Sequence, residues 1–426
     1  MEKISIFWFR RDLRLLDNTA LNQALAENNN VLPIFIFDEE ILNELPQDDP
    51  RINFIYDNLY AIDQTLKTHH ASIICLKGNP LEVWKKLIEE YPIHCVYVNK
   101  DYEPYAKNRD AKIAELLHSK GIEFKSFKDQ VIHEENEVMK IDGTPYTVFT
   151  PYKNQWLAIY KPQPPAESVA YKNFCQKVIP FPTLASLGFT KSSIQVVNYT
   201  LSQIENYPST RNFPDMDSTS YLSPHLRFGT VSIRSIISKL KATDHVFMSE
   251  LIWREFFMQI LFHFPHVVTQ NFKSKYDGIA WLNDENDFKK WCEGNTGYPM
   301  VDAGMRQLNE TGYMHNRVRM IVAGFLCKHL LIDWRFGEAY FSKKLLDYEL
   351  ASNNGNWQWA AGSGCDAAPY FRIFNPIEQL KKFDSNESYV KKWIPELGTK
   401  AYCKPIIEHP YARNRALETY KIGINN

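Results

Sequence analysis

The first 130 residues alternate between short apolar runs and segments with helical periodicity. The apolar runs are ISIFWFR, VLPIFIFD, ASIICLKG and HCVYVNKD, and IEFKSFKD follows as a fifth candidate strand. Between them lie segments such as PLEVWKKLIEEY, in which apolar residues recur with the period of a helix. Buried strands that alternate with amphipathic helices are typical of a parallel sheet covered on both faces. We therefore predict a doubly wound, five-stranded parallel α/β domain over residues 1–130.

The turn after the first predicted strand limits what this domain can bind. Parallel sheets bind ligands beyond the carboxyl ends of their strands. The turn reads WFRRDLRLLDN and lacks the G-x-G-x-x-G pattern. A standard dinucleotide-binding fingerprint is therefore absent.

The remainder of the chain consists of two parts that differ in composition and in periodicity. Residues 131–200 are rich in Pro, Ser and Lys, as in YKPQPPAES, and predict a long interdomain connector on the surface. From residue 201 to 426 the patterns are helical, as in SELIWREFFMQILFHF and RVRMIVAGFLCKHLL. This predicts an all-helical second domain, an architecture that buries cofactors between helices.

Composition narrows the class of protein. The net charge is -1, from 49 basic and 50 acidic residues, so any site for a polyanion must be a local patch. Seven scattered cysteines form no CxxC pair, which argues against a zinc ribbon and favours a reducing compartment. The N-terminus does not read as a signal peptide, and no apolar run is long enough to span a membrane. We expect a soluble, cytoplasmic protein with no metal site.

Four motifs outside the first domain could carry chemistry. In DSTSYLSPHLRFG, Thr219, Ser220 and Ser223 precede a helical pattern. Hydroxyls and free N–H groups at a helix start can bind phosphate, although an ordinary N-cap is the commoner meaning.

The second motif, SELIWREFFMQI, places Glu250, Trp253 and Arg254 on one face of a helix. This face is equally compatible with a cavity for a flat polar ligand and with a surface salt bridge beside a half-buried tryptophan. In the third motif, TGYMHNRVRM, Asn316 and Met320 share a face, and Arg319 could pair with a buried carboxylate. His315 is interpreted as a hydrogen-bonded core residue.

The fourth motif is LLDYELASNNGNWQW, residues 345–359. In a helix, Glu349, Asn353 and Trp357 form one stripe, and Trp359 points to another side. The stripe offers an acceptor, an amide and an indole to a planar heterocycle. The alternative is a capped helix with two core tryptophans, which the spacing alone does not exclude.

Seven segments together resemble the signatures of the photolyase/cryptochrome family, most closely the class I cyclobutane pyrimidine dimer photolyases. In order they are WFRRDLRLLDN, TSYLSPHLRFG, WREFF, TGYPMVDAGMRQL, GYMHNRVRM, DWRFGE and NNGNWQWAAGSGCDAAPYFRIFNP. The resemblance covers nearly the whole chain and is densest from 219 to 384. It implies a carbon–carbon lyase that repairs DNA under light, with a folded FAD in the helical domain.

The resemblance assigns the flavin-binding residues. Asp347 and Glu349 match two carboxylates beside the isoalloxazine and ribityl chain, with Arg319 paired to Asp347. Asn353 matches the amide that faces flavin N5. The remaining matches to cofactor-binding residues are Tyr207, Thr219, Ser220, Tyr221, Leu222 and Ser223.

The resemblance also implies a mechanism. Trp357, Trp334 and Trp281 match a chain that carries an electron from the surface to the excited flavin. In repair, excited FADH⁻ passes an electron to the dimer, the cyclobutane ring opens, and the electron returns. The bond breaking then needs no metal, nucleophile or general base, because the cofactor supplies the chemistry.

The implied substrate is a pair of adjacent pyrimidines that must be flipped out of the duplex. Trp253 and Trp359 match the apolar walls of the pocket, Glu250 matches the carboxyl that hydrogen-bonds the bases, and Asn316 and Met320 complete it. A rim that binds DNA phosphates, and so makes binding salt-sensitive, is matched by Arg211, Arg254, Arg317, Arg372 and Gln379, with Lys381 and Lys382 as further candidates.

Several positions depart from the family pattern. Glu349 stands where Asp is expected, and Phe247 and Tyr313 stand where Trp is usual. The N-terminal domain should hold an antenna chromophore (a reduced folate such as methenyltetrahydrofolate, an 8-hydroxy-deazaflavin or a second flavin), although some members have none. Glu103 resembles a folate contact.

Three alternatives remain. A cryptochrome-type photoreceptor would bind FAD without repair, but Asn353 and the short chain after KKWIPEL favour repair. The (6-4) photolyases carry paired histidines where this chain has HNRVRM. An ordinary flavin oxidoreductase would need a hydride-donor site, which the sequence does not supply. We expect a monomer whose partner is DNA that contains cyclobutane pyrimidine dimers.

Overall fold

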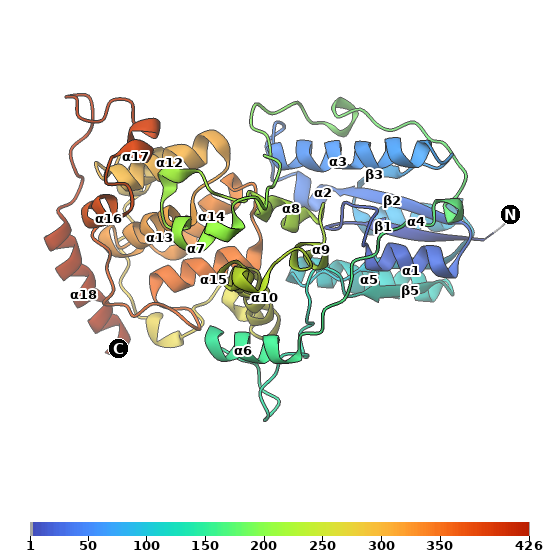
Figure 1. The fold of residues 1–426 in the computed structure, drawn as a ribbon, viewed down its shortest axis with the longest axis horizontal. Coiled ribbons are helices and arrows are strands. Elements are labelled where there is room, and N and C mark those ends of the chain that lie inside the picture. The colour runs from blue at the N-terminus through green and yellow to red at the C-terminus, as the bar shows by residue number, and fades with distance from the viewer. Residues whose placement is uncertain (1–2, 426) are drawn as a thin grey trace. The chain divides into compact units, whose positions relative to one another are not determined.

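The computed structural model describes residues 3–425, and the chain divides into two compact units (Figure 1). The first unit combines the chain up to Glu137 with Ile159–Asn198 and Leu222–Lys241. The second combines Val138–Ala158, Tyr199–Tyr221 and the chain from Ala242 onward. The predicted connector is therefore shared between the units, each of which is described by itself below.

The first unit contains a parallel five-stranded sheet, as predicted. Its strands are β1 (Ile4–Phe9), β2 (Val31–Asp38), β3 (Ile74–Gly78), β4 (Ile93–Asn99) and β5 (Glu123–Phe127), in the order β3-β2-β1-β4-β5. All four pairings are parallel. All eight side chains of β2 are buried, which explains its continuous apolar run.

Helices cover both faces of this sheet, which confirms the doubly wound prediction. The helices are α1 (Thr19–Glu27), α2 (Glu39–Leu42), α3 (Pro50–Lys67), α4 (Pro80–Glu90) and α5 (Pro104–Ser119). Successive residues of a strand point to opposite faces. Phe7 accordingly shares one apolar cluster with Leu59 of α3, whereas Trp8 shares another with Trp84 of α4.

One helix was not predicted. Residues Phe149–Ile159 form α6, within the segment that the sequence analysis interprets as a connector. Phe149 stacks on Trp253, with ring centroids 3.6 Å apart. Trp156 donates from Nε1 to Oε1 of Glu255 at 2.6 Å. These aromatic contacts bury one side of α6 in the second unit.

The second unit is built from helices, as predicted. They include α7 (Tyr207–Thr210), α10 (His245–His263), α11 (Glu285–Glu293), α12 (Pro299–Thr311), α13 (Asn316–Gly324), α14 (Trp334–Lys344), α15 (Leu350–Ala361), α16 (Pro376–Phe383), α17 (Ser388–Trp393) and α18 (His409–Asn425). A π-helical turn, Phe325–His329, follows α13. The helices α8 (Leu222–Phe228) and α9 (Ile233–Ile237) belong to the first unit. Across residues 3–425, every helix is too short or too polar to cross a membrane.

Helix α14 packs against α15 where a glycine faces a tryptophan. A Cβ atom added at Gly337 would lie 2.1 Å from Cη2 of Trp357. A real Cβ atom cannot approach a ring carbon so closely. Gly337 therefore gives the Trp357 indole room to pack in the core.

Gly337→Ala is expected to lower the free energy of unfolding by about 1–3 kcal/mol, the usual cost of overpacking a core. Chemical denaturation would measure the change. Gly324→Ala is the matched control, because its added Cβ would meet Phe374 at 3.8 Å, an ordinary contact. Equal stability of Gly337→Ala and the control would contradict the tight packing.

Candidate functional site

The buried amide of Asn353 is held in one orientation by α14. Asn353 lies in the first turn of α15 and is 8% exposed. Its Nδ2 donates to the carbonyl oxygen of Glu338 at 3.1 Å and to Oε1 of Glu338 at 2.8 Å. In the described part of the chain, no group donates to Oδ1 of Asn353. The amide therefore keeps an acceptor for an N–H donor, as the protonated N5 of a reduced flavin would require.

The Glu338 carboxyl lies mostly away from water. Burial raises its pKa, and the hydrogen bond from Asn353 opposes that rise. A carboxyl with a raised pKa takes up its proton at a higher pH than a carboxyl in water. The amide of Asn353 is thus linked to a titratable group that the sequence analysis did not identify.

Two carboxylates near the start of α15 are paired with arginines. Oδ2 of Asp347 accepts from Nη2 of Arg319 at 2.9 Å, which confirms the pairing implied by the resemblance. Oε1 of Glu349 accepts from Nη2 of Arg254 at 3.0 Å. Glu349 and Asp347 are therefore held at fixed positions, and the longer side chain of Glu349 reaches an arginine on α10.

This pairing bears on the predicted role of Arg254. The sequence analysis places Arg254 at the phosphate rim. In the structure its guanidinium lies against Glu349, a predicted flavin contact. The phosphate contact stays a prediction, and the ion pair links Arg254 to a residue that is predicted to bind flavin.

A second cluster joins Glu250 to Tyr207 of α7 and to Arg211, the residue that follows this helix. Arg211 lies 2.7 Å from Oε1 of Glu250 and also lies over the ring of Tyr207. Phe247 packs edge-on against Tyr207 at 5.2 Å. Burial raises the pKa of Glu250, and Arg211 opposes the rise. A raised pKa favours the protonated carboxyl, which can donate a hydrogen bond to a base carbonyl.

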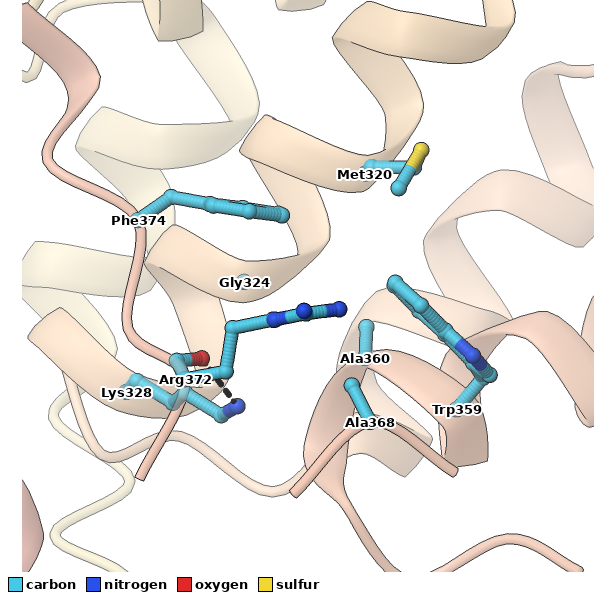
Figure 2. A pocket seen from close by; sticks show the side chains of 8 residues that line it. All are labelled: Met320, Gly324, Lys328, Trp359, Ala360, Ala368, Arg372 and Phe374. Carbon is cyan, nitrogen blue, oxygen red and sulfur yellow. Dashed lines mark hydrogen bonds between the residues drawn. The ribbon is translucent and has the colours of Figure 1, made fainter. Parts of the chain in front are cut away.

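A small open cavity lies beside α13 and α15 (Figure 2). It brings together three residues that the sequence analysis assigned to the substrate, namely Met320, Trp359 and Arg372. Its other lining residues are Gly324, Lys328, Ala360, Ala368 and Phe374. Lys328 escaped the sequence analysis because a single lysine in the run MIVAGFLCKHLL gives no sign of where it points.

The other predicted substrate residues lie outside the lining of this cavity. Trp253 stacks on Phe149, and Asn316 is exposed at the start of α13. Arg317 donates to Oδ1 of Asn212 at 2.6 Å and lies over the ring of Phe383. Their contacts with DNA stay predictions.

The predicted electron-transfer tryptophans differ in exposure. Trp334 and Trp357 are buried, and Trp281 is partly exposed. Nε1 of Trp334 donates to Oδ1 of Asn271 at 2.9 Å. Trp281 packs edge-on against Tyr420 at 5.8 Å. This gradation fits a path that begins at the surface and ends in the core.

The predicted phosphate-binding segment has an unusual backbone at Tyr221. Its φ is 53°, and its hydroxyl donates to Oδ1 of Asp217 at 2.6 Å. The carbonyl oxygen of Ser220 accepts from the backbone N–H of Thr200 at 2.9 Å. Leu222 and Ser223 fall in the first unit, at the start of α8. Phosphate binding by these residues stays a prediction.

The predicted folate contact Glu103 lies in the first unit, just before α5. Its Oε1 lies 3.1 Å from Nη1 of Arg11, which also pairs with Asp101 at 3.2 Å.

Among the described residues, no group of three or more His, Cys, Asp or Glu side chains could hold a metal ion.

The chain combines a parallel α/β unit with a helical unit that carries Asn353, Asp347 and Glu349, the residues predicted to bind flavin. Comparison with known families agrees. A model described as DNA photolyase matches residues 5–170, and one described as FAD binding domain of DNA photolyase matches residues 247–422. The chain belongs to the DNA photolyase family.

Relatives match it over nearly their whole length. Deoxyribodipyrimidine photo-lyases from Synechococcus sp. and Agrobacterium fabrum are each 36% identical, and the matches cover 95% and 97% of this chain and 93% and 97% of the relatives. The Escherichia coli photo-lyase is 34% identical, with 98% of both chains covered. The chain is thus an enzyme of the deoxyribodipyrimidine photo-lyase kind.

Solved structures show the same fold. A class III photolyase from Agrobacterium tumefaciens superposes with a TM-score of 0.90 at 34% identity, covering 100% of this chain and 98% of the other. An archaeal photolyase from Sulfolobus tokodaii with two FAD molecules gives 0.86 at 34% identity, covering 98% and 100%. The resemblance to the photolyase/cryptochrome family is confirmed, and the assignment to class I is not.

Proposed function

We propose that this protein splits cyclobutane pyrimidine dimers in DNA, with reduced FAD and light. The observation that carries the proposal is the fixed amide of Asn353, whose Oδ1 is left to accept a hydrogen bond at the position that matches flavin N5. When bound, the flavin supplies the light-excited electron that opens the cyclobutane ring.

The remaining residues hold the cofactor and the lesion. Asp347 and Glu349, each paired with an arginine, would bind the flavin beside Asn353. The indole of Trp359 and the thioether of Met320 would contact the flipped bases. The chain itself transfers no group to the substrate. The pocket therefore needs to exclude water and to hold the lesion at a fixed distance from the flavin.

We also propose the finer assignments. The lesion type is that of the class I enzymes, the protein is a cytoplasmic monomer, and its N-terminal unit holds an antenna chromophore. Two FAD molecules are present in the Sulfolobus tokodaii photolyase, so a second flavin is one candidate beside a folate or a deazaflavin. The absorption spectrum of the purified protein would distinguish these chromophores.

The repair function can be tested directly. The FAD-loaded protein would be illuminated with an oligonucleotide that contains one thymine dimer, and loss of the dimer would be followed in light and in darkness. We expect loss only in light. Uptake of flavin without any loss of dimer would instead support a cryptochrome-type photoreceptor, and absence of flavin uptake would refute both functions.

Trp359→Ala is expected to weaken binding of the dimer-containing oligonucleotide by about 1–3 kcal/mol, the usual cost of a lost base–aromatic stack. Fluorescence anisotropy in the dark would measure the dissociation constant. Trp359→Phe is the matched control, because it keeps an aromatic face for stacking. Unchanged affinity of Trp359→Ala would remove this residue from the pocket.

A further inference from the structure

Lys328 is a buried cation beside the proposed lesion pocket. It lies in the π-helical turn Phe325–His329, is 3% exposed and lines the cavity with Met320 and Trp359. In the described part of the chain, no carboxylate lies within ion-pair distance of Lys328. Burying an ammonium group without a carboxylate is costly unless another interaction compensates.

That interaction is a hydrogen bond to the segment that carries Arg372. Nζ of Lys328 donates to the carbonyl oxygen of Arg372 at 2.9 Å (Figure 2). Arg372 belongs to the segment between α15 and α16, and its side chain extends into the cavity toward Trp359. The bond therefore fixes the backbone from which the Arg372 guanidinium reaches across the cavity.

The cavity lining is cationic. Lys328 and Arg372 contribute two positive charges, and none of the lining residues is acidic. The substrate of the proposed reaction carries a phosphate between its two pyrimidines and several carbonyl oxygens. A positively charged cavity binds a ligand with these groups more favourably than a cavity that offers only apolar contacts to the ring faces.

The groups around Lys328 differ in how they titrate. Burial lowers the pKa of Lys328 to about 8. On the same turn, burial raises the pKa of the Cys327 thiol and lowers the pKa of His329 to about 3, so both are neutral near pH 7. From α18, His409 lies 2.8 Å from Nε2 of His329, and burial lowers the pKa of His409 as well.

Two arginines complete these surroundings. Arg415 of α18 donates to the carbonyl oxygen of His329 at 2.6 Å, and Arg372, whose carbonyl oxygen accepts from Lys328, extends its guanidinium into the cavity. Arginine stays charged over the whole working range of pH. Among these neighbours, Lys328 is therefore the group whose charge changes between pH 7 and pH 9.5.

We propose that Lys328 is a positioning residue for lesion recognition, which sets the place of Arg372 and keeps the cavity wall positive. This inference rests on the proposed function. A bound anionic lesion stabilises the charged form of Lys328 and raises its pKa in the complex. Preferential binding is then fully present below the pKa of the free protein and is lost as the pH rises through the pKa of the complex.

The test measures dark binding of the FAD-loaded protein to two oligonucleotides, one with a thymine dimer and one undamaged. Their ratio of dissociation constants removes effects common to all DNA. A pKa of Lys328 that is higher by one in the complex corresponds to a tenfold change in the dissociation constant. We therefore expect the preference for the dimer to fall by about tenfold between pH 7 and pH 9.5. A preference that stays constant over this range would overturn the proposal.

Variants separate charge from packing. Lys328→Met and Lys328→Gln should both reduce the preference at pH 7 and flatten its pH profile, and Lys328→Gln keeps an N–H donor if the methionine variant fails to fold. Lys289→Met, on the exposed face of α11, should retain the wild-type profile. A pH profile that persists in Lys328→Gln would also overturn the role. No preference at any pH in the wild type would refute the proposed function itself.

Discussion

Trp281→Phe is expected to abolish the light-driven reduction of oxidised flavin, while repair by enzyme reduced beforehand continues. A benzene ring is much harder to oxidise than an indole, so the variant lacks the partly exposed end of the proposed path. The positive charge would then remain on buried Trp334 or Trp357, and the electron would return from the flavin to that tryptophan. Loss of the oxidised flavin's absorption under blue light, with an external reductant, would measure the effect.

Trp291 supplies a matched comparison. It is fully buried and packs against Trp357 with ring centroids 6.1 Å apart, so it is a possible side branch. Because Trp291 is not exposed, we expect Trp291→Phe to keep most of the photoreduction. Normal photoreduction in Trp281→Phe would exclude Trp281 from the path. Loss of photoreduction in Trp291→Phe alone would move the path to the branch.

Local sequence patterns predicted the architecture because buried strands and helices each have a characteristic arrangement of apolar residues. The continuous apolar run VLPIFIFD became β2, which is buried along its whole length. The strand order β3-β2-β1-β4-β5 could not be predicted in this way, because periodicity is local and strand pairing is not. Helix α6 was missed because the Pro- and Lys-rich sequence after it dominated the interpretation of the connector.

In the candidate site as well, the sequence predicted local spacing but not the contacts between helices. Spacing placed Asn353 on a stripe with Glu349 and Trp357, and α15 carries Asn353 and Trp357 with Glu349 at its N-cap. Spacing could not show that Glu338, on the preceding helix, binds both hydrogens of the Asn353 amide. Such partners depend on how two helices pack.

Asn353→Asp is expected to destabilise the reduced flavin through this contact with Glu338. The change replaces a donor by an acceptor that faces Oε1 of Glu338, where Nδ2 now lies at 2.8 Å. It also places negative charge beside a reduced flavin that is itself anionic. At an effective dielectric constant of about 20, two like charges at close range repel each other by up to about 4 kcal/mol. For a two-electron couple, this lowers the midpoint potential by up to roughly 90 mV.

Spectroelectrochemical titration would measure that potential, and two variants separate the causes. Asn356→Asp adds the same charge to an exposed position of α15 and should leave the potential nearly unchanged, because solvent screens it. Adding Glu338→Gln to Asn353→Asp replaces the opposing carboxyl by an amide that can donate, so part of the loss should be recovered. An unchanged potential in Asn353→Asp would separate Asn353 from the flavin. A loss that Glu338→Gln does not relieve would leave the charge beside the flavin as the whole cause.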